Sequence, residues 1–264
     1  MQSFQAVDPV RPVAPWLGGK RNLAKRLVAR INAVPHDTYA EAFVGMGGVF
    51  LRRDRRPKCE VINDASQDVA NLFRVLEHHY VAFTDMIRFQ ISSRANFERL
   101  SRQDPETLTD MRRAARFLYL QRLAFGGRVA GARSLAMVAG RPAYFDVTKI
   151  APMLADLGDR MSGVNIECLD WQVFLRRWDR PGTLFYLDPP YFGCERMYGA
   201  GMFDRGQFEV MAQLLADIKG RFILSLNDHP EVRRIFAAFD IEEVGTTYST
   251  GPKPKPAREL IISN

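Results

Sequence analysis

The chain has 264 residues, a length that suits one sizeable α/β domain with room for a small insertion. Hydrophobic residues make up 47% of it and charged residues 25%, which supports a real core and excludes a chain that is disordered throughout. The net charge of +7 favours a polyanionic partner, since basic groups that neutralise phosphates release counterions, although a basic protein without a nucleic-acid role fits the charge equally well.

The first eighty residues alternate between helical and strand-like apolar patterns. Residues 1–15 contain three prolines, which discourage a helix, so we expect an extended arm. After this arm, apolar residues recur first at helical spacing and then in short runs that end in glycine or an acid. The predicted elements are a helix at 22–31, a strand at 39–44, a glycine turn at 45–48, a strand at 59–63 and a helix at 68–76.

Residues 81–145 differ from the rest, because they are rich in arginine, carry little strand signal and end in a glycine-studded stretch. We interpret them as an inserted, mainly helical lobe between two parts of one domain, 1–80 and 146–264. Strand–helix alternation then resumes. The predicted elements are strands at 164–168, 183–187 and 222–226, a helix at 208–218, and a closing hairpin of strands at 241–244 and 259–262.

This alternation predicts an α/β fold of the Rossmann-like kind, with a mostly parallel sheet and helices on both faces. Ligands of such sheets bind beyond the carboxyl ends of the strands, where the strand order reverses. The three cysteines, at positions 59, 168 and 194, form no CxxC pair, which argues against disulfides and a zinc site and indicates a reducing compartment. The sequence shows no signal core and no membrane-spanning run, so we expect a cytoplasmic protein without metal or membrane partner.

The segment Asp188-Pro189-Pro190-Tyr191 directly follows the predicted strand at 183–187. Prolines fix φ and cannot continue a β-ladder, so this turn holds the Asp188 carboxylate and the Pro189 carbonyl rigidly as acceptors, beside an aromatic face. Such a site suits a planar base that bears an amino group. Acceptors for the amino hydrogens localise the nitrogen lone pair, which can then attack a sulfonium methyl group in line. The alternative is a proline turn that merely caps a strand.

A second candidate site is the glycine turn after the strand at 39–44. Gly45 and Gly47 let the backbone approach a ligand closely, although any tight turn has this composition. Asp64 ends the next predicted strand, where an acid holds the ribose hydroxyls of a nucleotide. By itself Asp64 is more often a helix N-cap, but the combination favours an adenosyl ligand.

These segments and several others resemble, in order, the motifs of the Dam-type (D12 class) adenine-N6 DNA methyltransferases. The resemblance covers nearly the whole chain, and motifs in a fixed order are far more specific than any one of them. The matching segments are Pro15 to Lys20, Glu41 to Gly47 (except Ala42), Asn63-Asp64, Asp170-Trp171, Asp188 to Tyr191, Ser225 to Pro230 and Glu259 to Asn264.

The resemblance implies S-adenosylmethionine as cofactor and a base that is flipped out of double-stranded DNA. The implied catalytic residues are Asp188, Pro189, Pro190 and Tyr191. The implied cofactor-binding residues are Trp16, Lys20, Glu41, Phe43, Gly45, Gly47, Asp64, Asp170 and Asp188. Without the motif order, plain core packing would be the simpler interpretation of Trp16, and a solvated charge that of Lys20.

The family reads its DNA sequence through the segment that corresponds to residues 81–145. Arginine grips phosphate bidentately and pairs with guanine, whereas a solvated helix face is the simpler interpretation of Arg112, Arg113 and Arg116. GATC-specific members carry Phe-Asn-Gly-x-x-Arg in this segment; the chain has Phe125 to Arg128 without that Asn, so we predict a different recognition sequence. The candidate DNA contacts are Lys20, Arg94, Arg122, Arg128, Arg133 and Arg141.

Three alternatives remain open. An N4-cytosine or RNA amino methyltransferase would use the same physics, although cytosine members usually have Ser in place of Asp188. A catalytically inactive DNA-binding regulator would not need Asp188, and an oxidoreductase would need a fuller glycine fingerprint than residues 45–49 provide. The protein is expected to be bacterial or phage-encoded and to act in the cytoplasm, associated with the nucleoid, as a monomer or weak dimer.

Overall fold

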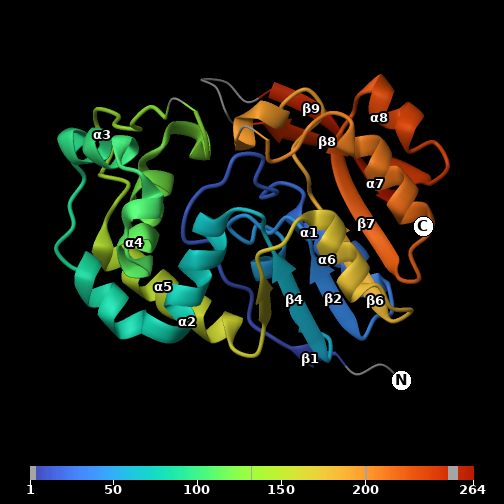
Figure 1. The fold of residues 1–264 in the computed structure, drawn as a ribbon, viewed down its shortest axis with the longest axis horizontal. Coiled ribbons are helices and arrows are strands. Elements are labelled where there is room, and N and C mark those ends of the chain that lie inside the picture. Colours follow the sequence, from blue (N-terminus) through green and yellow to red (C-terminus); the bar gives the residue numbers. More distant parts are fainter. Residues whose placement is uncertain (1–3, 132, 200, 249–254) are drawn as a thin grey trace.

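The computed structural model describes residues 4–131, 133–199, 201–248 and 255–264 and has a seven-stranded sheet at its centre (Figure 1). The strand order is β5-β4-β2-β6-β7-β9-β8, in which the first five strands are parallel and β9 is antiparallel to both of its neighbours, β7 and β8. The predicted α/β fold is therefore confirmed. The strands are β2 (Thr38–Glu41), β4 (Cys59–Asn63), β5 (Asn165–Glu167), β6 (Thr183–Leu187), β7 (Arg221–Asn227), β8 (Asp240–Tyr248) and β9 (Lys255–Ser263).

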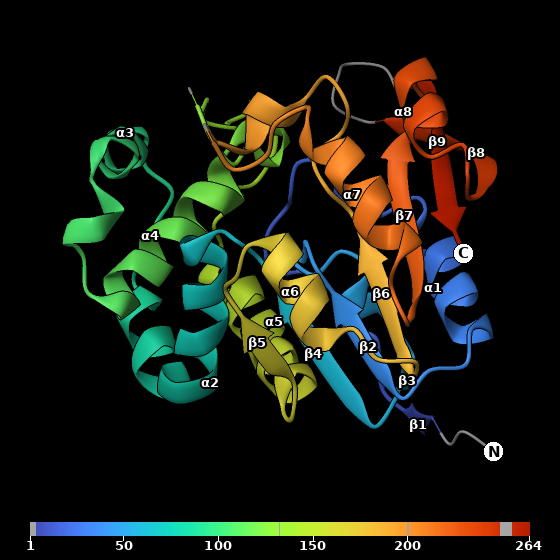
Figure 2. The ribbon, with the colours of Figure 1, turned by 45° about the vertical axis from the view of Figure 1, so that its right-hand side comes forward.

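Alternating strand residues belong to two cores, one on each face of the sheet. Tyr39 and Ile62 pack into one core, while their chain neighbours Ala40 and Val61 pack into the other. Both faces are buried, which explains why β6 is a continuous apolar run. The first face is covered by α1 (Ala24–Ala33), α2 (Gln67–Ile87) and α5 (Val147–Met161), and the second by α6 (Trp171–Trp178), α7 (Gln207–Ala216) and α8 (Pro230–Ile235) (Figure 2).

Strand β2 marks the point where the strand order reverses. It pairs in parallel with β4 on one side and with β6 on the other, and Glu41 lies level with Ile62 and Tyr186. The carboxyl ends of all three strands therefore meet at one edge of the sheet. Asp64 and Asp188 are the first residues after β4 and β6, so the topology brings the two acids to opposite sides of β2.

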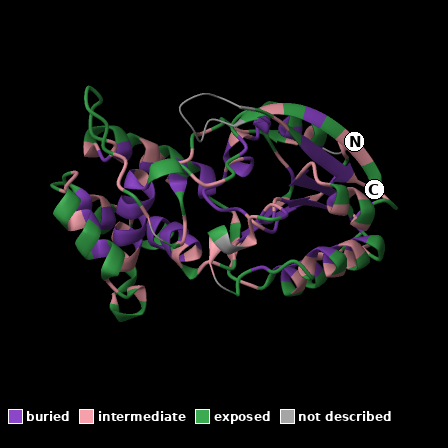
Figure 3. Cartoon of the chain, turned by 90° about the horizontal axis from the view of Figure 1, so that it is seen from above, coloured by how far each residue is buried: buried purple, intermediate pink, exposed green. Residues whose placement is uncertain are grey.

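A group of helices extends from the β5 side of the sheet (Figure 1). Here α2 packs against α4 (Asp110–Leu123), and α4 packs against α3 (Arg94–Arg102). The core on this face runs without a break from the sheet into these helices, whose inner sides are buried (Figure 3). The division into 1–80, 81–145 and 146–264 remains a prediction.

Several boundaries differ from those predicted. Strand β2 ends at Glu41 rather than at residue 44, and α2 continues to Ile87 through a kink at His79, while α5 and α6 had no predicted counterpart. None of the helices formed by the described residues is long and apolar enough to cross a membrane. The remaining elements are the paired strands β1 (Gln5–Ala6) and β3 (Arg55–Arg56) and the 3-10 helices η1 (Phe50–Arg52), η2 (Pro105–Thr107), η3 (Phe125–Gly127) and η4 (Glu195–Tyr198).

Candidate active site

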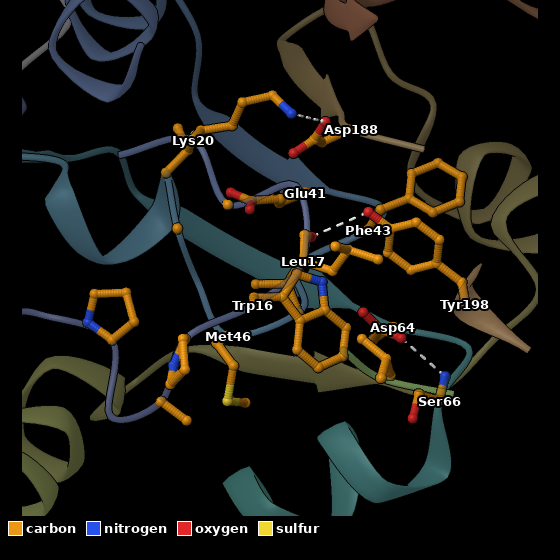
Figure 4. Close-up of a pocket in the computed structure, with 18 of the residues that line it drawn as sticks. Trp16, Leu17, Lys20, Glu41, Phe43, Met46, Asp64, Ser66, Asp188 and Tyr198 are labelled. Atoms are coloured by element: carbon orange, nitrogen blue, oxygen red, sulfur yellow. Dashed lines mark hydrogen bonds and ion pairs between the residues drawn. The ribbon is translucent and has the colours of Figure 1, made fainter. Parts of the chain in front are cut away.

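A cavity of about 620 Å³ lies at the carboxyl ends of β2, β4 and β6 (Figure 4). Its volume is that of a typical small-molecule site. It collects residues from five of the segments quoted above, although they lie up to about 170 positions apart in the chain. The predicted catalytic and cofactor-binding residues that line it are Trp16, Lys20, Glu41, Phe43, Asp64, Asp170, Asp188 and Pro190.

The glycine turn after β2 is shaped by close packing. Gly45 has a φ of 50°, and a Cβ there would lie 2.5 Å from the indole nitrogen of Trp16. Gly47 has a φ of 73°, and a Cβ there would meet the Leu51 side chain at 2.7 Å. Both positions therefore require glycine. Trp16 is half-buried between this turn and Phe117, so it is a cavity wall as well as a packed residue.

Asp64 is fixed by backbone donors. Its Oδ2 accepts a hydrogen bond from the Gly45 N–H at 2.8 Å, and its Oδ1 accepts one from the Ser66 N–H at 2.9 Å (Figure 4). Burial raises the pKa of the Asp64 carboxyl to about 6, against these two hydrogen bonds, which lower it. Ser66, not Asp64, is the N-cap residue of α2. The carboxylate thus ties the glycine turn to the end of β4.

An aromatic cluster forms part of the cavity wall that Asp64 also lines. Phe43 contacts Trp171 and Phe203, with ring centroids 6.4 Å and 6.0 Å apart. Asp170 begins α6 as its N-cap, accepting a hydrogen bond from the Gln172 N–H at 2.8 Å, and it also lines the cavity. The cluster offers aromatic surface to the cavity close to an acid, which suits a purine ring.

Asp188 is held by side chains rather than by backbone. Lys20 is only 3% exposed, and its Nζ lies 2.5 Å from Asp188 Oδ1 and 2.8 Å from the Tyr191 hydroxyl, so a solvated charge is the wrong interpretation of this lysine. The same Nζ lies 4.5 Å from the centre of the Tyr191 ring. Burial raises the pKa of the Asp188 carboxyl to about 6, although the charge of Lys20 lowers it.

A buried hydroxyl pair supports Asp188 from behind. The Ser225 Oγ donates a hydrogen bond to Asp188 Oδ1 at 3.2 Å and lies 2.8 Å from the Tyr186 hydroxyl. Ser225 and Tyr186 are fully buried on the adjacent strands β7 and β6. Asp188 Oδ1 therefore has two partners, while Oδ2 has no hydrogen-bond partner among the residues that the structure describes.

A comparison with protein-family models identifies the family to which a chain with these cavity residues belongs. The model of the D12 class N6 adenine-specific DNA methyltransferases matches residues 16–250, from the tryptophan of the cavity wall to beyond β8. The chain belongs to this family. It is therefore an enzyme that methylates the N6 of adenine in DNA. Adenine is also the base that the sequence predicted, because Asp188 stands where cytosine-specific members usually have Ser.

Similarity to individual proteins is lower. The methyltransferase is 23% identical over 277 residues to Type II methyltransferase M1.LlaDCHI of Lactococcus lactis subsp. cremoris, covering 97% of this chain and 95% of that protein. Among solved structures, it is similar to a precorrin 8W decarboxylase of Methanobacterium thermoautotrophicum, with a TM-score of 0.41, 11% identity and coverage of 98% and 99%. Another is protein 1320 of Thermoplasma acidophilum, with a TM-score of 0.36, 9% identity and coverage of 90% and 83%.

Glu41 is the most deeply buried acid of the methyltransferase cavity. It is 2% exposed, and its Oε2 accepts a hydrogen bond from the Tyr39 hydroxyl at 2.5 Å. Burial raises the pKa of the Glu41 carboxyl to about 8, and the nearby Asp188 charge raises it further, although the Tyr39 hydrogen bond lowers it. At neutral pH Glu41 is therefore mostly protonated and can donate as well as accept a hydrogen bond.

The arginines predicted to contact DNA have different environments. Arg94, Arg128 and Arg141 are exposed. Arg122 lines the cavity and donates to the backbone carbonyls of Val13 and Tyr144, while Arg133 is half-buried and donates to the carbonyl of Val129.

The neighbouring helix α4 also differs from expectation. A solvated helix face is wrong for Arg113, which pairs with Asp68 and Glu106, and for Arg116, which is 8% exposed and donates to the carbonyl of Leu100. Arg112 is exposed, as expected.

Three cavity features were not predicted individually. Tyr198 donates from its hydroxyl to the Leu17 carbonyl at 3.0 Å and so connects the segment after Tyr191 to the N-terminal motif (Figure 4). Phe203 packs against Phe43 in the aromatic cluster, and Met46 lies on the cavity wall. Tyr198 and Phe203 follow the catalytic motif within about a dozen residues, and that proximity was the one available signal.

Proposed function

We propose that this methyltransferase transfers the methyl group of S-adenosylmethionine to the N6 of an adenine that has been flipped out of double-stranded DNA. The observation that carries the proposal is the single cavity that both Asp64 and Asp188 line. The two acids follow neighbouring strands of β2, where a Rossmann-like sheet binds its ligands. One acid would hold the methyl donor and the other the acceptor base.

The Asp64 half of the cavity fits an adenosyl ligand. Each Asp64 oxygen accepts one backbone hydrogen bond, and a carboxylate oxygen has a second lone pair for a ribose hydroxyl. Phe43, Trp171 and Phe203 offer flat walls to the adenine ring. When bound, S-adenosylmethionine supplies an electrophilic sulfonium methyl group.

The Asp188 half fits the acceptor base. Asp188 Oδ2 and the Pro189 carbonyl would accept hydrogen bonds from the N6 amino group and so localise the nitrogen lone pair toward the methyl group. Tyr191 would stack on the base. Lys20 would shift its hydrogen bonds as the amino group arrives, because its Nζ already lies against Asp188 and Tyr191.

The DNA side of the proposal rests on the arginine-rich residues 81–145. We assign sequence recognition to this segment, with exposed Arg94, Arg128 and Arg141 as candidate phosphate or base contacts. Phe125 to Arg128 lacks the asparagine of the GATC-specific pattern, so the proposed site differs from GATC. A monomer or weak dimer, bacterial or phage-encoded and located in the cytoplasm, remains the expected form.

The decisive test is incorporation of a labelled methyl group from S-adenosylmethionine into unmethylated plasmid DNA, followed by nucleoside analysis. We expect N6-methyladenine, and none with Asp188→Ala. N4-methylcytosine would overturn the choice of base. Failure to label DNA, by a protein that binds both the cofactor and DNA, would overturn the proposed mechanism.

The same labelled DNA tests the recognition sequence. We expect the modified adenines, mapped by sequencing, to share a motif other than GATC. Modification confined to GATC would contradict this part of the proposal and leave the reaction itself unaffected.

A further inference from the structure

Three arginines outside every motif described above line the same cavity: Arg11, Arg21 and Arg52. Arg11 belongs to the N-terminal arm, Arg21 directly follows Lys20, and Arg52 ends η1. Arg11 and Arg21 are exposed, and Arg52 is half-buried. The trio therefore lies at a solvent-facing part of the cavity wall.

Backbone contacts bring the trio together. The Val10 N–H donates to the Leu51 carbonyl at 2.8 Å, which holds Arg11 alongside Arg52. Arg52 donates from its Nη1 to the carbonyl of Gly48. A Cβ on Gly48 would lie 3.6 Å from the backbone nitrogen of Lys20, so Arg21 lies beside the same turn.

The trio has no acidic counterpart. Among the residues that the structure describes, no carboxylate lies within ion-pair distance of Arg11, Arg21 or Arg52, and Arg52 has one backbone carbonyl as its acceptor. Partial burial lowers the pKa of the Arg52 guanidinium, and the charges of Arg21 and Arg11 lower it further. Three neighbouring cations without a counterion repel one another, and a bound anion would relieve that repulsion.

Three other arginines near this region are paired with acids. Arg53, next to Arg52 in the chain, is fully buried and pairs with Glu60, and Arg26 and Arg30 of α1 share Glu242. Among the residues that the structure describes, the fold thus supplies carboxylates to Arg26, Arg30 and Arg53 but to none of the cavity-lining trio. That contrast indicates that the trio is matched to an anion from outside the chain.

We propose that Arg11, Arg21 and Arg52 bind a backbone phosphate of the DNA strand that carries the target adenine, next to the flipped nucleotide. This inference rests on the proposed function. Arg21 adjoins Lys20, which contacts Asp188, so the trio lies next to the place proposed for the base. Arginine binds phosphate bidentately, and an exposed rim is open to a duplex. The methyltransferase would then grip DNA on the sheet side of the cavity as well as through residues 81–145.

The test compares the salt dependence of DNA binding. Duplex affinity is measured from about 50 to 200 mM salt, a range over which phosphate contacts weaken steeply. For Arg52→Gln, and more fully for Arg11→Gln, Arg21→Gln and Arg52→Gln combined, we expect weaker binding and a slope of log affinity against log salt that is reduced by about 1. The matched control is Arg55→Gln, which removes an exposed arginine of β3 that does not line the cavity.

A second measurement separates phosphate from the other anion the cavity is proposed to receive, the carboxylate of the cofactor's amino-acid part. Titration with S-adenosylmethionine in the absence of DNA should give the same affinity for the triple variant and the wild type. A loss of cofactor affinity with an unchanged salt slope would overturn the inference, because the trio would then serve the cofactor. A triple variant that binds DNA like Arg55→Gln would also overturn it.

Failure of this inference is distinguishable from failure of the proposed function. Wild-type protein that forms N6-methyladenine, with a salt slope that the triple variant does not change, overturns the phosphate site alone. Replacement of the trio by lysines keeps the charge, so recovery of the slope in that protein would exclude misfolding as the cause of the glutamine effect.

Discussion

Asp64 and Asp188 form a natural pair for comparison. Each follows a parallel strand next to β2, each lines the cavity, and burial raises the pKa of each from 3.8 to about 6. They differ in what holds them. Backbone N–H groups of Gly45 and Ser66 hold Asp64, whereas the side chains of Lys20 and Ser225 hold Asp188.

Because of this difference, Asp64 is an acceptor in a fixed position, whereas Asp188 is an acceptor whose hydrogen-bond partners can be exchanged. Backbone donors are positioned by the fold, so Asp64 presents the same geometry before and after a ligand binds. The Lys20 ammonium can rotate or withdraw, so Asp188 can change partners when an amino group arrives. This arrangement suits the proposed roles, in which Asp64 holds a cofactor in a constant pose and Asp188 receives a base that enters and leaves.

The largest effect is expected from Asp188→Ala. Removing the acceptor for the amino group should reduce methyl transfer by about 10²- to 10³-fold, the cost of losing one preorganised transition-state group. Cofactor affinity should stay nearly intact, because Asp64 is unchanged. Methyl incorporation and cofactor titration measure the two quantities.

A folding defect is the main confounding outcome for that variant, since alanine leaves buried Lys20 without its acid partner. A thermal melt controls for it, and Asp188→Asn retains one acceptor oxygen with a similar volume. Turnover close to wild type in folded Asp188→Ala would remove Asp188 from its assigned role.

Asp64→Ala should show the opposite result, with weakened cofactor affinity and nearly unchanged methyl transfer. Loss of hydrogen bonds to a charged acceptor, about 1.5–3 kcal/mol, corresponds to roughly 10- to 100-fold weaker cofactor binding. Turnover at saturating cofactor should change little, because Asp188 and its partners are intact. Asp64→Asn, which keeps one acceptor, should fall between the two. An unchanged cofactor affinity would mean that Asp64 only ties the glycine turn to β4.

The sequence was sufficient to identify both acids, because each directly follows an apolar run and the signal is local. The same holds for the sheet, whose seven strands all overlap predicted ones. The residues that contact Asp188 could not be predicted from the sequence. Lys20 meets Tyr191 across 171 residues, and Ser225 meets Asp188 across 37, so these contacts depend on the strand order rather than on any local pattern.

Element lengths were also difficult to predict where tertiary packing overrides local pattern. The helix predicted at 68–76 continues to Ile87, because residues beyond its kink, such as Phe83, pack into the core shared with α4. Arg116 is buried although its side chain is charged, and its guanidinium donates a hydrogen bond to the Leu100 carbonyl. Such a contact cannot be read from the spacing of apolar residues.

The pH dependence of cofactor affinity and of methyl transfer provides a second comparison between Asp64 and Asp188. Each carboxylate accepts hydrogen bonds as the anion, so methyl transfer and cofactor affinity should both be full above pH 6 and fall about tenfold per unit below it. In Asp64→Asn, the acid limb of cofactor affinity should disappear while that of turnover remains. Loss of both limbs together would show that the two acids titrate as one coupled group.

The same pKa shifts have the opposite sign for stability. A carboxyl whose pKa is raised on folding binds more protons in the folded state, so its contribution to stability is present below about pH 4 and lost as the pH rises through about 6. The free energy of unfolding of Asp64→Asn, measured by denaturant at both pH values, should therefore depend less on pH than that of the wild type. An equal dependence would indicate that the unfolded chain shares the raised pKa.

The smallest effect is expected from Ser225→Ala, which removes one neutral hydrogen bond to Asp188 Oδ1. A loss of about 0.5–1.5 kcal/mol corresponds to a roughly 2- to 10-fold lower turnover, with cofactor affinity unchanged. Because this hydrogen bond lowers the pKa of Asp188, its removal should move the acid limb of turnover to higher pH. Ser101→Ala on α3 is the control, because it also removes one neutral hydroxyl hydrogen bond, to the Phe97 carbonyl, at an exposed residue that does not line the cavity. A shifted limb would show that an acid held by side chains can be tuned one bond at a time, which no side-chain substitution can do to the backbone donors of Asp64. An unchanged pH profile would mean that Lys20 alone positions Asp188.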